Sequence, residues 1–125
     1  MAVPRITKEE LKQRLEAADA ASRPVLIDVR LKYPYEHSSV KLPDAIRIPP
    51  NAPQVPALPR DRDIVAYDSD PDEVVSAPFV ADLIRRGYRA AALKGGIPDW
   101  ITAKFPLETK GAPQMSAPAP GSLKA

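Results

Sequence analysis

The sequence predicts a small single-domain α/β protein, in which a central parallel five-stranded sheet is flanked by helices on both faces. The chain has 125 residues, enough for one domain with a modest core. Short strand patterns alternate with helical patterns along residues 5–108, which is typical of parallel sheets. Apolar runs are far shorter than the about 20 residues needed to cross a bilayer. We therefore expect no membrane association and a cytoplasmic location.

The first helix and the first strand have clear sequence signals. Thr7 and Glu10 match a capping box, and apolar residues follow at helical spacing, so we expect a helix from Lys8 to Asp19. Pro24 ends that segment. Residues 25–29 then have the apolar, β-branched pattern of a buried strand.

Two more strands are predicted in the middle of the chain. Residues 45–48 form a short strand candidate, and residues 63–67 form a stronger one. Six prolines fall between positions 43 and 59, and each fixes φ and removes a backbone donor. That stretch should be a rigid, mostly non-helical surface connection.

The last predicted elements are two helices separated by a strand. Ser76 is a candidate cap for a helix with one apolar face, and Gly87 suits the position after its end. Residues 90–93 form a strand pattern. After a Gly-Gly turn, a helix over residues 97–104 should place Trp100 on its inner face.

Composition limits the chemistry. The chain has no cysteine, which excludes disulfides, thiolate metal sites and any thiol nucleophile in this polypeptide. Eighteen Lys and Arg against sixteen Asp and Glu leave a net charge of +2, spread along the chain, so we expect no nucleic-acid partner. Residues 109–125 are rich in Pro and Ala and lack hydrophobic periodicity, which predicts a disordered tail.

Several separate motifs together resemble a rhodanese-like domain, a sulfurtransferase homology domain, over residues 5–108. They are Asp28-Val29-Arg30, the segment 42–49, the apolar strand ending in Tyr67, Arg86-Gly87-Tyr88, Leu93-Lys94-Gly95-Gly96 and Trp100. Their order and spacing match the family. The resemblance implies the α/β fold described above and a functional loop after Tyr67.

That loop departs from the family at its central residue. In the most similar subgroup it reads Tyr-Cys-x-Cys-Pro-Asn-Glu-Ala-Thr-Ser-Ala, and here Asp68 and Asp70 replace both cysteines. The resemblance implies that backbone N–H groups at this helix N-terminus would hold a thiolate or a persulfide. The Asp68 carboxylate can accept the same N–H groups, but it cannot form a persulfide. We infer that Asp68 occupies this anion site, and that an external anion would be repelled by Asp70, Asp72 and Glu73.

Other departures point the same way. Pro34 stands where the family usually has a glutamate, so the usual partner of Arg30 is missing and Glu36 is the candidate substitute. Asp44 replaces a family glycine. Tyr33 and Tyr35 could frame the mouth of the former active site or merely cover a sheet edge. Since scaffold motifs survive and catalytic ones do not, the sequence favours binding over turnover.

The leading hypothesis is therefore a catalytically inactive rhodanese-like domain that binds a protein or regulates one. We expect no enzyme activity, cofactor or metal, and a monomer or weak dimer. The expected binding residues lie on the former active-site loop, with Arg30 beside it: Asp68, Ser69, Asp70, Asp72, Glu73, Val74, Val75 and Ser76. Within this hypothesis, Asp68 caps the loop through backbone N–H groups.

The alternatives are an enzyme of altered chemistry, cation-dependent or hydrolytic, built on the acidic loop, or a residual role related to sulfur transfer. The acidic run superficially resembles the start of a calcium loop. It fails where Glu73 replaces the required glycine and where Phe79 replaces the bidentate glutamate. As a nucleophile or base, Asp68 lacks an evident partner. His37, the only histidine, is expected to be an ordinary surface residue.

Overall fold

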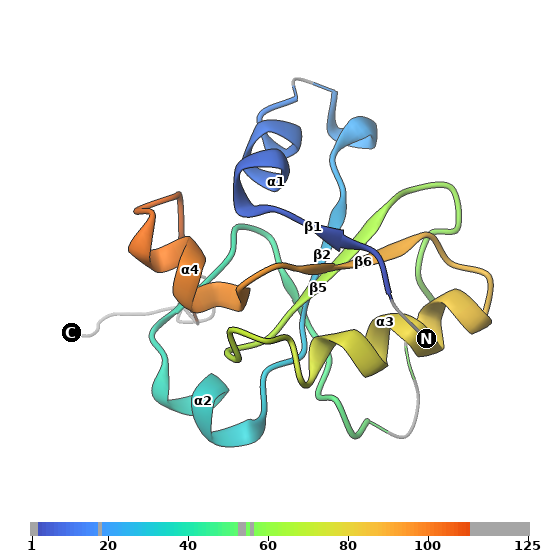
Figure 1. The fold of residues 1–125 in the computed structure, drawn as a ribbon. Helices are drawn as coiled ribbons and strands as arrows, with labels where there is room; N and C mark the ends of the chain where they lie inside the picture. The colour runs from blue at the N-terminus through green and yellow to red at the C-terminus, as the bar shows by residue number, and fades with distance from the viewer. Residues whose placement is uncertain (1–2, 18, 53–54, 56, 111–125) are drawn as a thin grey trace, which may run out of the picture.

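The computed structural model describes residues 3–17, 19–52, 55 and 57–110. Five parallel strands form the main sheet in the order β1-β6-β5-β2-β4 (Figure 1). They are β1 (Arg5–Ile6), β2 (Val25–Asp28), β4 (Ile46–Arg47), β5 (Ile64–Tyr67) and β6 (Ala90–Leu93). A separate antiparallel pair joins β3 (Val40–Lys41) to β7 (Glu108–Thr109). The helices are α1 (Lys8–Leu15), α2 (Lys32–His37), α3 (Ser76–Arg85) and α4 (Gly96–Thr102), with one 3-10 turn, η1 (Ala20–Ser22).

The centre of the sheet is the pair β2 and β5. Every residue of β5 is buried, as expected for a parallel strand covered on both faces. The register pairs Val25 with Ile64 and Asp28 with Tyr67. The two strands therefore end together, and the segments that follow them leave the same edge of the sheet.

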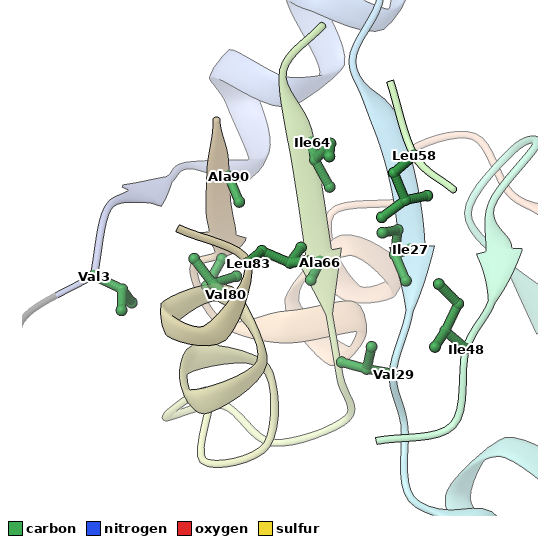
Figure 2. Packing of buried hydrophobic residues seen from close by; sticks show 11 residues of the cluster. Val3, Ile27, Val29, Ile48, Leu58, Ile64, Ala66, Val80, Leu83 and Ala90 are labelled. Atoms are coloured by element: carbon green, nitrogen blue, oxygen red, sulfur yellow. The ribbon is translucent and has the colours of Figure 1, made fainter. Parts of the chain in front are cut away.

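Helices cover both faces of the sheet, which confirms the predicted fold class. On one face, Val80 and Leu83 of α3 belong to a buried cluster with Ile27 and Ala66 (Figure 2). On the other face, Leu11 of α1 and Trp100 of α4 belong to a second cluster, with residues of β2, β5 and β6. Among the described residues, no helix has the length and apolar character needed to span a membrane.

The predicted helices and strands are present, with shifted ends. The first helix ends at Leu15 rather than Asp19, because the Asp19 side chain instead accepts the N–H of Ala21 and caps η1. The sequence pattern did not indicate β1, α2, β3 or β7. Each of these elements has only two to six residues, too few for a reliable periodicity.

Two predicted loop segments differ from expectation, one in its burial and one in its pairing. Ile48 and Leu58 are buried, so the proline-rich connection 43–59 contributes to the core and is not only a surface connection. Pro53, Gln54 and Pro56 lie outside the described residues, as do residues 111–125 of the predicted tail. The start of that tail is paired, since Thr109 lies in β7 and the Lys110 N–H donates to the Ser39 carbonyl.

Candidate functional site

The candidate site is the loop of residues 68–75, which leaves the carboxyl end of β5 and leads into α3 (Figure 1, the yellow-green loop). In a parallel sheet, this edge is where ligands commonly bind. The first turn of α3 directs its free backbone N–H groups toward the end of the strand. The local fold thus forms a site for negative charge.

The Asp68 carboxylate fills this site. Asp68 is fully buried. Its Oδ2 accepts the N–H groups of Val75, at 2.8 Å, and Ser76, at 2.6 Å, while its Oδ1 accepts the N–H of Asp70 at 2.8 Å. The prediction that Asp68 caps the loop through backbone N–H groups is confirmed. The N–H groups that would otherwise face a ligand already have an acceptor.

Ser76 does not cap α3, and that prediction is wrong. Val75 holds the N-cap position without a side-chain cap bond, because the Asp68 carboxylate takes the N–H groups from across the loop. The Ser76 hydroxyl is buried and has no hydrogen-bond partner among the described residues. Ser76 therefore contributes its backbone N–H to the site.

The turn at Gly95 and Gly96, where α4 begins, packs closely against the loop of residues 68–75. The Ile97 N–H donates to the Asp68 carbonyl at 2.9 Å. Gly96 has a φ of 65°, and a Cβ there would lie 2.6 Å from the Asp68 carbonyl oxygen. The close approach of two backbones requires glycine at this position.

Glu73 faces inward, which corrects the expectation that it presents negative charge to solvent. Its side chain is only 6% exposed. One carboxylate oxygen accepts from Arg5 of β1, and the other accepts the Gly95 N–H at 2.9 Å. Glu73 thereby ties the loop to the first strand and to the glycine turn, with its own φ at 55°.

Arg30 is paired with Asp28, not with the predicted Glu36. Both side chains are buried, with Nη2 to Oδ2 at 2.7 Å and Nε to Oδ1 at 3.0 Å. The Tyr67 hydroxyl also donates to Asp28 Oδ2, at 3.1 Å. Burial and the adjacent Asp28 charge raise the pKa of Tyr67. Since Arg30 is 1% exposed, it stabilises the carboxyl edge of the sheet from within.

The Tyr35 ring packs against two cations, and the sequence pattern did not predict these contacts. The Arg47 guanidinium lies 4.0 Å from the centre of its ring, and the Lys110 amine lies 3.9 Å from it. Partial burial, followed by the nearby Arg30 charge, lowers the pKa of Lys110. Tyr33 is 68% exposed. Of the two tyrosines expected at the mouth, one is thus part of the packing and one faces solvent.

The predicted binding residues separate into an inner and an outer group. Asp68, Glu73, Ser76 and Arg30 are buried. Ser69, Asp70 and Val75 are half-buried, and Asp72 and Val74 are exposed. Within the described ranges, no group of three or more His, Asp or Glu side chains is placed to hold a metal ion. The arrangement offers a closed carboxylate site beneath a small exposed surface.

Comparisons with known proteins agree with this architecture. The sequence model of the rhodanese-like domain matches residues 7–103. A rhodanese-related protein from Thermoplasma volcanium has a similar structure, with a TM-score of 0.69 and 22% identity over 84% of this chain and 97% of the other. A rhodanese-like domain protein from Staphylococcus aureus gives a TM-score of 0.65 and 24% identity over 78% and 90%.

A third similar structure is the BH2092 protein from Bacillus halodurans, with a TM-score of 0.72 and 20% identity over 86% of this chain and 77% of the other. No curated protein sequence matches. At these identities the solved structures establish the fold alone, so the function has to be argued from the site.

Proposed function

Because the chain belongs to the rhodanese-like domain family, and because its Asp68 carboxylate fills the anion site of the loop, we propose that it is a non-catalytic member that binds a protein partner. The single observation that carries this proposal is the set of N–H groups that Asp68 accepts. Sulfur transfer by the family's usual route needs a thiolate that forms and releases an S–S bond. A carboxylate cannot form that bond, and the chain has no cysteine.

The exposed side chains at the carboxyl edge of the sheet support the binding part of the proposal. Leu31 and Tyr33 follow β2 and are 52% and 68% exposed. Val74, in the loop after β5, is 63% exposed, and Asp72 is exposed beside it. Since β2 and β5 are parallel neighbours, these four residues share one edge, which we call the carboxyl-edge surface. Its chemistry suits a protein segment with apolar side chains and a basic group.

An enzyme of altered chemistry built on the acidic loop is less well supported. A nucleophile or general base needs an accessible lone pair, whereas Asp68 is buried and accepts on both oxygens. Glu73 is engaged by Arg5 and Gly95. No observation favours this alternative. The cytoplasmic location and the monomeric or weakly dimeric state stay predictions.

The catalytic part is tested with a thiosulfate:cyanide assay on the purified chain. We expect thiocyanate formation at the level of a heat-killed control. Turnover above that level, proportional to protein concentration, would show that the domain transfers sulfur without the usual nucleophile and would overturn the proposal.

The binding part is tested by affinity capture with two matched double variants. Y33S/V74S removes exposed apolar side chains from the carboxyl-edge surface. As the control, I101S/L107S removes two apolar side chains that are also exposed, though less so, at 43% and 37%, from α4 and the segment after it. We expect a specific partner, identified by mass spectrometry and then purified, to bind wild type and I101S/L107S equally and Y33S/V74S at least tenfold more weakly. Equal affinity for both variants would place the function elsewhere.

A further inference from the structure

An open cavity lies at the end of the sheet opposite the loop. Its volume is about 490 Å³. It is lined at the amino ends of three neighbouring strands, by Val25 at the start of β2, Ile46 at the start of β4, and Arg62 just before β5. No residue from 68 to 76 lines it. A ligand here would not compete with anything at the carboxyl-edge surface.

The wall of this cavity is largely apolar. Leu26 and Trp100 are buried, and Leu15 of α1 closes one side. Ile46 is 42% exposed, high for an isoleucine in a strand, and it lines the same cavity. Concave, mostly apolar sites of this size with a few polar groups are typical of small-molecule binding.

One cation at the cavity is fixed in place and lacks a countercharge. The Arg62 guanidinium donates to the carbonyls of Ala20 and Arg23 through Nε and Nη2. Across the part of the chain that the structure describes, no carboxylate forms an ion pair with Arg62. By contrast, Lys12, which also lines the cavity, is paired with Glu16 at 2.7 Å.

The other acidic residue that lines the cavity, Asp44, lies on the side away from Arg62. Asp44 precedes β4, whereas Arg62 precedes β5, and β2 lies between these strands. Two strand spacings separate them by about 10 Å. Asp44 is also exposed, so solvent screens its charge. The Arg62 side therefore favours negative charge, and the apolar wall extends away from it.

We propose that this cavity binds a small amphipathic monocarboxylate. Its carboxylate lies at Arg62, and its apolar chain lies on the accessible apolar lining residues Leu15, Val25 and Ile46. A single carboxylate suits the Arg62 position, because this one guanidinium compensates one negative charge. The pre-ordered guanidinium loses little side-chain entropy on binding. This inference is independent of the function proposed for the loop.

Trp100 provides a direct readout, because it is the only tryptophan in the chain. Its indole Nε1 donates to the Pro106 carbonyl at 2.7 Å, and both residues line the cavity. A titration with octanoate, followed by the indole N–H cross-peak in a ¹H–¹⁵N spectrum, should give a saturable shift. We expect octylammonium to bind at least tenfold more weakly than octanoate. Absence of a saturable octanoate shift, or preference for the amine, overturns the proposal.

Two variants locate the carboxylate. R62Q should weaken octanoate about tenfold and leave 1-octanol within twofold. R60Q, a neighbouring arginine that does not line the cavity, should leave both affinities unchanged. Should R62Q fail to fold, I46E adds a carboxylate at a half-exposed position of the same cavity and should reverse the preference from octanoate to octylammonium. Wild-type octanoate affinity in either folded variant overturns the proposal.

Discussion

The two ends of the central sheet differ in how their charged groups are paired and buried. At the carboxyl edge, Asp68 is buried and accepts three backbone N–H groups, and Arg30 is buried against Asp28. At the amino edge, Arg62 borders an open cavity, and within the described residues its donors reach backbone carbonyls and no carboxylate. An internally satisfied group stabilises the fold and leaves nothing for a ligand, whereas an unpaired group beside a cavity keeps its charge available.

The difference also separates the shape of a site from its chemistry. The loop has the backbone geometry of an anion site, and the Asp68 side chain of the same chain supplies the anion. The site therefore acts as a structural element. The predictions below test whether the carboxyl edge is closed and structural while the amino edge is open.

The largest effect is expected from removing the buried arginine. Arg30→Met removes the closer cation from the buried Asp28 carboxylate and leaves the longer ion pair with Arg47, at 3.7 Å. We expect a loss of about 3 kcal/mol in the free energy of unfolding. Arg62→Met, the matched change at the amino edge, should cost about 1 kcal/mol. Urea denaturation of both variants measures the two values.

Two outcomes would decide how far this contrast holds. Asp28→Asn in the Arg30→Met background should recover part of the stability, because it removes the uncompensated charge. Equal losses for the two arginine variants would show that the edges do not differ as described.

The next effect concerns the filled anion site. Asp68→Ala leaves the N–H groups of Asp70, Val75 and Ser76 without their acceptor, which should cost roughly 2 to 3 kcal/mol of stability. The emptied site should then accept an external anion at the N-terminus of α3. In thermal melts, sulfate should therefore raise the Tm of the variant more than that of wild type, with chloride at equal ionic strength as the control. An identical sulfate response in both proteins would argue against a latent anion site.

A smaller effect is expected when a thiol replaces the carboxylate. In Asp68→Cys, the backbone N–H groups and the helix N-terminus should lower the thiol pKa by about one unit from its usual 8.5. Because the wild-type chain has no cysteine but the same four tyrosines, the difference in absorbance at 240 nm between variant and wild type during a pH titration reports this single thiolate. Ser69→Cys, one residue along the same loop, is the control and should titrate near the usual value. Equal values in both variants would mean that the N–H groups do not favour negative charge.

The sequence was sufficient for four of the five strands of the main sheet and for the capping of the loop by Asp68. Both follow from local patterns, because a buried strand, a short loop and a helix together fix where backbone N–H groups point. The Arg30–Asp28 pair was missed although a signal was present. Arg30 follows the last residue of β2, Asp28, by only two positions, so two opposite charges this close in the sequence were the available signal.

Other features depend on contacts that no local pattern contains. Glu73 faces inward because Arg5 reaches it from a strand 68 positions away, and that strand has only two residues. The cavity is likewise assembled from segments far apart in the chain, from Lys12 on α1 to Pro106 after α4. Side-chain direction in a loop and the shape of an open cavity are set by tertiary packing, which hydrophobic periodicity does not encode.

The smallest effect is expected from the exposed ion pairs at the amino edge. Asp63 precedes β5, and its side chain is 37% exposed. The hydrogen bond from Arg14, with a further contribution from Arg89, holds the pKa of Asp63 below its usual 3.8. The stabilisation is therefore fully present above pH 3.8, and it is lost as the pH falls through the lower folded-state pKa. Because solvent screens this carboxylate, Asp63→Asn should cost less than about 1 kcal/mol at pH 7.

The pH dependence distinguishes this charge effect from a packing effect. The stability difference between wild type and Asp63→Asn, measured by urea denaturation, should shrink toward zero as the pH falls below the folded-state pKa of Asp63, where both side chains are neutral. Salt should reduce the difference at pH 7, since exposed pairs are screened. A stability difference that persists unchanged at low pH would show that Asp63 acts through packing and not through its charge. The amino edge would then be closed in the same way as the carboxyl edge.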